Sequence, residues 1–144
     1  MSQLIGIAIR QKKRAPMELL DSAFVTTEKG IVNDFRGKPG NRQVTVLSKT
    51  AWNTACDELG QMLDWQIRRA NLLVDDIDLQ EKTGKIIRIG EIQLKITQET
   101  DPCKRMEELV AGLFKALAKQ WRGGVCCRVI SEGQIKIGDK VEII

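Results

Sequence analysis

The chain has 144 residues, 42% hydrophobic and 29% charged, so its composition is that of a globular protein rather than of a disordered chain, a collagen or a coiled coil. It contains no histidine, which excludes Ser-His-Asp and Cys-His catalysis and every histidine-ligated metal site. The net charge is +4, and the positive excess lies within residues 1–50, where it indicates an anionic ligand, a nucleic-acid surface or simply a solvated surface.

This length predicts one domain over residues 1–144. Apolar stretches such as residues 4–9 are far shorter than the roughly 20 residues of a membrane span, and no apolar signal segment follows the first residue. Four cysteines, two of them adjacent, do not form a disulfide framework. We therefore expect a cytoplasmic protein that makes no membrane contact.

The first third of the chain predicts short strands and one long loop. Residues 4–9 are apolar and rich in isoleucine, which is typical of a buried strand, and residues 23–27 predict a second strand. Between residues 28 and 43, glycine, proline and asparagine interrupt any period. A loop of this length is usually functional or disordered. Residues 44–47 predict the next strand.

The middle of the chain predicts a helix, a strand and a hairpin. Ser48 is a suitable N-cap for a helix that Gly60 weakens at its end. Residues 69–74 predict a strand, and residues 86–89 and 92–96 predict a hairpin with glycine in its turn. The apolar face of the helix has three- and four-residue spacing and consists of Trp52, Ala55, Cys56, Leu59, Met62 and Leu63.

The last third predicts a second helix and a second hairpin. The helix ends at Gly123-Gly124, and the hairpin is expected between residues 124–130 and 134–143. The apolar stripe of this helix consists of Met106, Leu109, Val110, Leu113, Phe114, Leu117 and Trp121. About seven or eight short strands with two helices predict a mainly β (α+β) fold, a barrel with helices packed outside it.

Cys103 has the strongest chemical signal among the cysteines. Asp101 suits the N-cap of the second helix and Pro102 its first position, which would place Cys103 in the first turn. A helix N-terminus and the neighbouring cations Lys104 and Arg105 stabilise a thiolate, which is the nucleophile and the soft metal ligand. The alternative is a loop cysteine without chemistry.

The other cysteines are expected to be structural. Cys56 lies on the apolar face of the first helix and is expected in the core. Cys126 and Cys127 are neighbours on a predicted strand, so their side chains point to opposite faces. We expect one of them in the core and the other outside.

Seven short segments resemble, in order and spacing, the MOSC domain, the family named after the C-terminal domain of molybdenum cofactor sulfurase. They are residues 30–34, 42–48, 69–72, 89–92, 101–103, 123–129 and 137–141. The resemblance runs from about Leu4 to the C-terminus, so the chain resembles a stand-alone MOSC protein. It implies a β-barrel-like fold with two or more flanking helices, in agreement with the elements predicted above.

The resemblance also implies roles for single residues. Cys103 matches the cysteine that carries sulfur as a persulfide or binds the metal of the molybdenum cofactor, molybdopterin. Asp34 matches the acidic residue of a Gly-Asp motif, although Asn33 stands where glycine is usual. Arg69 and Asn71 match an Arg-x-Asn pair near the pterin.

Molybdopterin carries a phosphate and a dithiolene, which require cationic donors and a soft protein ligand. Arg69 is expected to clamp the phosphate, Asn71 to bond the pterin edge, and Asp34 to position a metal-bound oxygen or accept a proton. Structurally, Asp34 would instead only cap a turn, and Arg69 would pair with Asp75 or Asp76. The long loop supplies three further cofactor-binding cations, Arg36, Lys38 and Arg42.

Three functions are compatible with these features. The first is a cofactor-binding or sulfur-carrier protein that works with a PLP-dependent cysteine desulfurase or a molybdoenzyme, with no PLP site expected in this chain. The second is a small molybdoenzyme that reduces N-hydroxylated compounds with electrons from an external donor protein. The third, a nucleic-acid-binding barrel, usually needs exposed aromatics. The chain has three tryptophans, three phenylalanines and no tyrosine, and half of these lie in helix stripes, so no nucleic-acid partner is expected.

Overall fold

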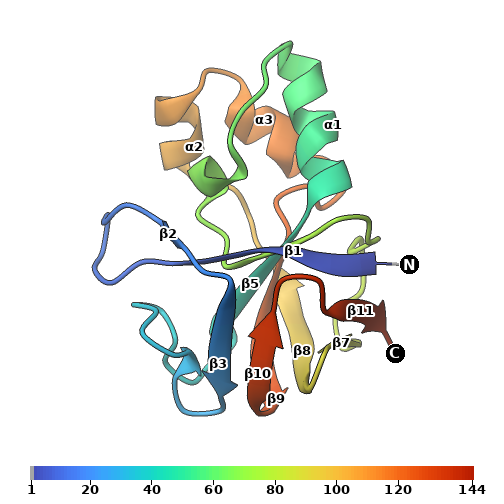
Figure 1. The fold of residues 1–144 in the computed structure, drawn as a ribbon. Coiled ribbons are helices and arrows are strands. Elements are labelled where there is room, and N and C mark those ends of the chain that lie inside the picture. The colour runs from blue at the N-terminus through green and yellow to red at the C-terminus, as the bar shows by residue number, and fades with distance from the viewer. Residues whose placement is uncertain (1) are drawn as a thin grey trace.

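The computed structural model describes residues 2–144, and its centre is a closed barrel of seven β-strands (Figure 1). In order around the barrel these are β1 (Ser2–Ile9), β6 (Leu72–Val74), β5 (Val44–Ser48), β9 (Val125–Ser131), β8 (Ile92–Glu99), β7 (Ile86–Ile89) and β11 (Lys140–Ile143). Pairing of Ser2 with Val141 joins β11 to β1 and closes the ring. The predicted mainly β barrel with outer helices is confirmed.

The barrel interior is filled by the inward residues of these strands. Leu4, Ile7, Ile89 and Leu94 belong to one buried cluster that extends across the barrel. The predicted hairpin of residues 86–89 and 92–96 is confirmed, because β7 and β8 pair with Ile89 opposite Ile92. Alternation along β8 buries Ile92, Leu94 and Ile96 and leaves the residues between them half-buried.

A parallel strand pair explains how the helices reach the outside of the barrel. β5 and β6 run parallel, with Val46 opposite Leu72, so the segment between them must cross over. This crossover contains α1 (Lys49–Leu59) and a short 3-10 helix, η1 (Trp65–Arg68). The strand predicted over residues 69–74 therefore begins only at Leu72, because Arg69 still ends η1.

A small second sheet covers one end of the barrel. It consists of β10 (Gly133–Lys136), β3 (Ser22–Thr26) and β4 (Gly30–Ile31), and the two-residue strand β2 (Glu18–Leu19) pairs antiparallel with the end of β1. The predicted hairpin within residues 124–143 is wrong. β9 pairs with β5 and β8, whereas β10 pairs with β3, where Ile135 and Val25 join the barrel core.

The predicted second helix is also wrong as one continuous element. It consists of two short helices, α2 (Lys104–Leu109) and α3 (Leu113–Ala118), separated by Gly112 at φ +87°, a conformation that a right-handed helix cannot continue. Of the predicted stripe, Leu109 and Phe114 are exposed. Trp121 lies beyond α3 and packs on the barrel core. Among residues 2–144 no helix is long and apolar enough to cross a membrane.

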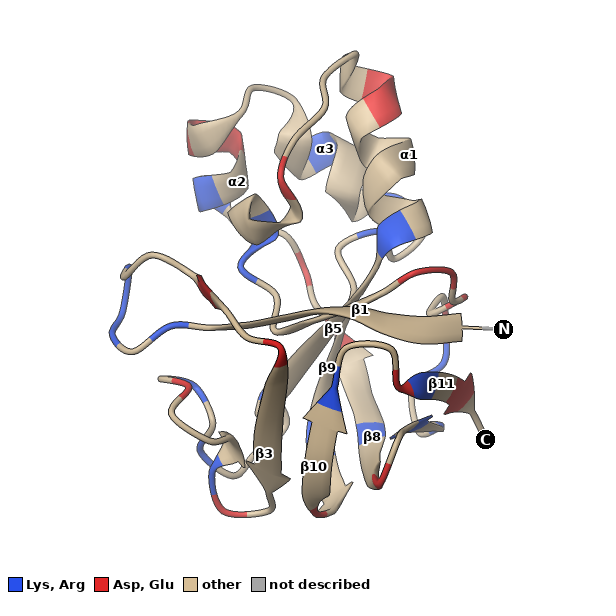
Figure 2. Ribbon diagram, in the orientation of Figure 1, with Lys and Arg blue, Asp and Glu red and all other residues tan. Residues whose placement is uncertain are grey.

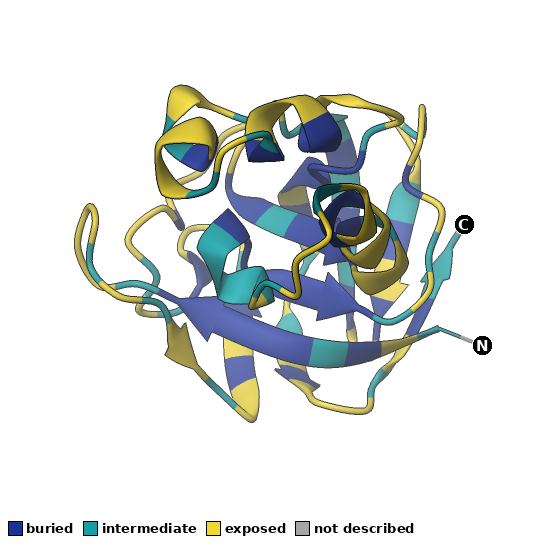
Figure 3. Cartoon of the chain, turned by 90° about the horizontal axis from the view of Figure 1, so that it is seen from above, coloured by how far each residue is buried: buried dark blue, intermediate teal, exposed yellow. Residues whose placement is uncertain are grey.

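The helices form a layer over one side of the barrel, with their buried residues facing it (Figure 3). The Ser48 hydroxyl accepts a hydrogen bond from the Ala51 amide, which confirms the predicted N-cap. Trp52 and Cys56 are buried in the core of this layer, as predicted. Met62 is fully exposed, contrary to the prediction, because the helix ends before it.

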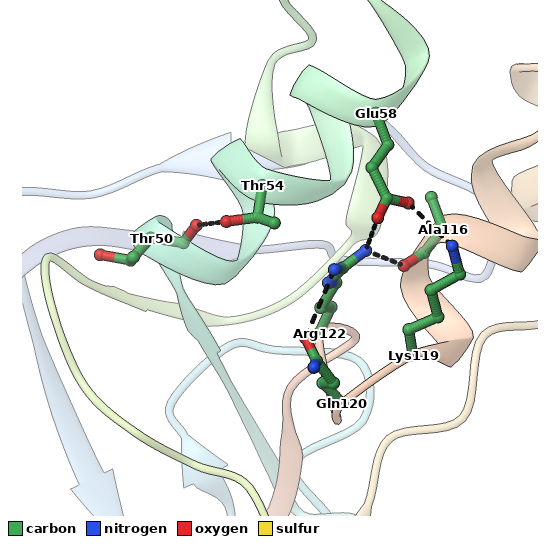
Figure 4. Close-up of polar contacts among 7 residues, drawn as sticks. All are labelled: Thr50, Thr54, Glu58, Ala116, Lys119, Gln120 and Arg122. Atoms are coloured by element: carbon green, nitrogen blue, oxygen red, sulfur yellow. Dashed lines mark hydrogen bonds and ion pairs between the residues drawn. The ribbon is translucent and has the colours of Figure 1, made fainter.

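An ion-pair network joins α1 to the segment after α3 (Figure 4). Nη1 of the buried Arg122 lies 2.8 Å from Glu58 Oε1 and donates to the Ala116 carbonyl at 3.2 Å. Lys119 Nζ lies 3.3 Å from the other Glu58 oxygen. The hydrogen bond from Arg122 lowers the pKa of the Glu58 carboxyl. The network fixes the residues that lead into β9.

The turn before β9 makes a stability prediction. Gly124 has φ +94°, and a Cβ there would lie 2.3 Å from the Val46 carbonyl oxygen. Gly124→Ala should therefore cost about 3 kcal/mol, from a strained backbone and a steric clash. That cost lowers Tm by about 10 °C for a chain of this size. Differential scanning calorimetry measures this, and an unchanged Tm would show that the tight turn is not formed.

Candidate functional site

A cavity of about 290 Å³ opens between the barrel and α2. This volume is at the lower end of the range of small-molecule sites, about 300–1,000 Å³. Two aspartates line it, Asp34 and Asp101. They face six arginines: Arg10, Arg36, Arg42, Arg68, Arg69 and Arg105. Basic residues in the loop between β1 and β2 and at the start of α2 are visible around this region (Figure 2). Such an excess of cations favours an anionic ligand.

The cavity collects nearly all of the residues that the sequence singled out. Lys38 is the exception, because it lines a shallower neighbouring hollow formed by residues 35–42. The predicted site residues in the cavity wall are Asp34, Arg36, Arg42, Arg69, Asn71 and Cys103. They come from three separate parts of the chain, the long loop, the segment before β6 and the segment before α2, so the fold brings together residues that are far apart in sequence.

Cys103 is exposed at the edge of this cavity. It is the N-cap residue of α2 and has extended backbone angles, so the predictions that it lies in the first turn and that Asp101 is the cap are wrong. The helix begins late because the preceding segment is held in an extended form. Thr100 donates its amide to the Gly124 carbonyl at 2.9 Å, and its carbonyl accepts a bond from Arg68.

Both cysteines of β9 are buried, which corrects the expectation that one would lie outside. Cys127 points into the barrel core, and burial raises the pKa of its thiol above its ordinary value. Cys126 points the opposite way and lines the cavity, where its Sγ lies 3.2 Å from Thr100 Oγ1. The outward face of β9 is buried because the segment before α2 covers it.

Asp34 projects from the long loop that follows β4. The preceding Asn33 has φ +76°, a left-handed conformation that asparagine tolerates better than most residues, so it replaces the usual glycine. Asp34 is half-buried, and its Oδ1 accepts a hydrogen bond from the Arg10 amide at 3.1 Å. Burial, followed by the charges of Arg69 and Arg36, lowers the pKa of the Arg10 guanidinium. Asp34 is therefore a carboxylate placed close to several arginines whose charges repel one another.

Arg69 has a strained backbone and an incompletely bonded side chain. Its φ is +63°, which is unusual for arginine. Its Nη2 donates to the Ala15 carbonyl, and its buried Nε has no hydrogen-bond partner among residues 2–144. The considered pairing with Asp75 or Asp76 is not formed. Nε of Arg105 is likewise buried without a partner.

Asn71 is used by the fold itself. Its Oδ1 accepts the Thr45 amide at 3.0 Å and lies 3.2 Å from the Thr45 hydroxyl. Its Nδ2 donates to the Ala8 carbonyl at 3.1 Å. The side chain therefore joins β5 to β1 at the cavity wall. A contact with a pterin edge stays a prediction.

The strain at Arg69 makes a second stability prediction. Glycine adopts a positive φ without the penalty of about 1 kcal/mol that a Cβ brings. Arg69→Gly should therefore be about 1 kcal/mol more stable than Arg69→Ala in urea unfolding, because both lack the guanidinium and differ only in the Cβ. If Arg69→Ala is equally stable or more stable, the left-handed backbone is refuted. Strain retained at a cavity residue is typical of functional sites.

The cavity residues that were missing from the predicted site include three cations and a thiol: Arg10, Arg68, Arg105 and Cys126. Arg68 directly precedes Arg69 and Arg105 lies two residues after Cys103, which was the available signal. The sequence gives no signal for Cys126, because only the structure shows that the segment before α2 covers β9. Among residues 2–144, no three or more His, Cys, Asp or Glu side chains gather in a way that could hold a metal ion.

Comparison with known proteins identifies relatives. A family model described as MOSC domain matches residues 30–142, most of the chain. No curated protein sequence matches it significantly.

Solved structures with the same fold include the YUAD protein from Bacillus subtilis, which has 20% sequence identity and a TM-score of 0.80 and aligns over 99% of this chain and 96% of its own. YiiM from Geobacillus stearothermophilus has 15% identity and a TM-score of 0.79 over 100% of this chain and 75% of its own. YiiM from Escherichia coli has 16% identity and a TM-score of 0.73, over 99% and 69%. These identities establish the fold alone.

Proposed function

This chain belongs to the MOSC domain family, and on that premise we propose that its cavity binds the molybdenum cofactor, molybdopterin, or carries sulfur on Cys103. The observation that carries the proposal is the placement of one exposed thiol in a cavity lined by six arginines. A ligand that fits must be anionic and must contain a group that bonds to a thiolate, such as a soft metal or a sulfur atom. Molybdopterin and a persulfide both meet these conditions.

The arginines fit the phosphate of the cofactor. Buried N–H groups without a partner are costly, and an oxyanion would satisfy both Arg69 Nε and Arg105 Nε. Arg10 and Arg36 add charge at the same end of the cavity, because their charges interact with Arg69. We assign the phosphate to this end, with Arg105 replacing Lys38 in the predicted set.

Cys103 fits the metal end of the cofactor. Its thiolate would be the soft protein ligand, because it is exposed whereas the Cys126 thiol is buried in the cavity wall, and the dithiolene would supply further sulfur ligands. When bound, the cofactor would supply two-electron redox chemistry at molybdenum. Cys103 would hold that group, the arginines would orient it, and Asp34 would hold or accept a proton at its carboxylate.

The sulfur-carrier role uses the same thiol without a metal. A persulfide on Cys103 requires a donor that already holds sulfur at the oxidation level of a persulfide, and a PLP-dependent cysteine desulfurase is such a partner. The surrounding arginines would stabilise the anionic terminal sulfur. The acceptor would be a molybdoenzyme or its cofactor.

The two roles are separated by analysing protein purified, without reductant, from a host that makes molybdopterin. Molybdenum and pterin near one per chain support cofactor binding and direct the next assay to N-hydroxylated bases with an electron-donor protein. A mass gain of one sulfur on the tryptic peptide 96–104, which contains Cys103 alone among the cysteines, supports the carrier. If neither is found, even after supplying cofactor or a sulfur donor, the proposal is wrong.

A further inference from the structure

Arg68 is a buried arginine in the cavity wall with an unusual set of partners. Its exposed fraction is 7%. Nε donates to the Gly123 carbonyl at 3.1 Å, and Nη2 donates to the Thr100 carbonyl at 2.9 Å. Nη1 makes no hydrogen bond within the described part of the chain. The guanidinium is therefore held from two sides, which leaves Nη1 for the cavity.

Arg68 has no carboxylate within ion-pair distance among residues 2–144, although Asp101 lines the same cavity. An arginine stays protonated in proteins, and a buried charge is costly unless an anion compensates it. Burial lowers the pKa of Arg68, and the charge of Asp101 is among the influences that oppose this shift. Arg68 and Cys103 line the same cavity, and Arg68 bonds to Thr100 in the segment that leads to Cys103, so the compensating anion is expected at this end of the cavity.

Arg68 is directed away from the phosphate end of the cavity. Arg69, its neighbour in sequence, donates to Ala15 in the loop between β1 and β2. Arg68 instead reaches the segment before α2 and the turn before β9. A Cβ at Gly123 would lie 3.1 Å from Arg68 Nη2 and 2.6 Å from the Thr100 carbonyl oxygen, so this packing is tight.

We propose that Arg68 forms a second anion-binding site at the Cys103 end of the cavity, separate from the arginines of the phosphate end, and that it admits small anions to the Cys103 sulfur. The site would take a compact anion such as a sulfur anion, a carboxylate or an oxyanion. Arg42 lines the same cavity, and its charge adds to that of Arg68. The proposal rests on the proposed function only in taking Cys103 as the reacting thiol.

The site is tested by comparing two alkylating reagents of similar size, iodoacetate and iodoacetamide. With each, the Cys103 sulfur bonds to the methylene carbon and iodide leaves, so the ratio of the two rates at one pH cancels thiol exposure and ionisation. Mass spectrometry of peptide 96–104 measures both rates. The expected ratio for the protein is about tenfold above that of free cysteine, since one nearby cation is worth about 1.4 kcal/mol.

Three variants assign the effect to Arg68. In Arg68→Met the ratio should fall about tenfold, whereas Arg68→Lys, which keeps the charge, should retain most of it. The matched control is Arg88→Met, which removes an exposed arginine paired with Glu142 on β11 and should leave the ratio unchanged. An unchanged ratio in Arg68→Met, or an equal loss in Arg68→Lys, would overturn the proposal.

A measurement on the unaltered protein covers the case in which Arg68→Met does not fold. Raising the salt concentration from about 20 to 500 mM should lower the ratio towards that of free cysteine, because salt screens the cation. A ratio equal to that of free cysteine at low salt refutes the second anion site. These measurements require neither molybdenum nor a sulfur donor, so the site and the proposed function can fail separately.

Discussion

Replacing Arg69 and Arg105 together by Met should reduce the pterin that co-purifies with the chain at least tenfold. Each arginine has a buried Nε without a protein partner and would give a charge-assisted hydrogen bond to the phosphate. Such bonds are worth about 1.5–3 kcal/mol each, so losing two weakens binding by about 100-fold or more. Pterin is measured by fluorescence after the protein is denatured.

The control for this double variant is Arg88→Met with Arg128→Met, which removes the same charge from exposed strand positions. It should keep its pterin, since a loss of net charge alone does not remove hydrogen bonds in the cavity. Equal losses in both double variants would mean that general electrostatic attraction holds the ligand and that the two arginines have no specific role.

Cys103→Ser should abolish the sulfur cargo and lower the molybdenum content about tenfold, while leaving the fold intact. The hydroxyl that replaces the thiol is a much poorer ligand for a soft metal site and cannot form a persulfide. Cys103 is exposed and its side chain makes no capping hydrogen bond, so Tm should change by no more than about 2 °C. Elemental analysis, peptide mass and calorimetry measure these three quantities.

Cys56→Ser provides the opposite pattern as a control. Cys56 is buried in the core of the helical layer, where a hydroxyl costs about 1–3 kcal/mol. This variant should lose stability and keep its molybdenum or sulfur. A Cys103→Ser protein that keeps both cargoes would refute the role assigned to that thiol.

Local patterns predicted the barrel strands well because each kind of burial leaves a simple pattern. The strand at residues 92–96 follows from alternation, the strand at residues 4–9 from a continuous apolar run, and the helix start from the capping group of Ser48. The prediction of one long second helix was wrong because an apolar stripe keeps the same spacing whether or not the helix is interrupted. The stripe continues past Gly112, whose positive φ interrupts the helix.

The site was predictable only where residue chemistry is visible in sequence. Cys103 and Asp34 attract attention by type and motif, and the structure places both in one cavity. Lys38 was assigned to the site because of the composition of its loop, but in the structure it lines a neighbouring hollow instead of the cavity. Arg68 and Cys126 line the cavity because they contact Thr100 from elements that are distant in sequence, and a local sequence pattern does not reveal such contacts.

In both proposed roles the Cys103 sulfur forms a direct bond, either to the molybdenum of the bound cofactor or to the outer sulfur of a persulfide. X-ray absorption at the molybdenum edge, on protein purified from a host that makes molybdopterin, tests it most directly. We predict that molybdenum in the unaltered protein has one sulfur neighbour more than in Cys103→Ser, or that a persulfide is found on Cys103 in place of molybdenum. Molybdenum with the same sulfur neighbours in both proteins would contradict the claim.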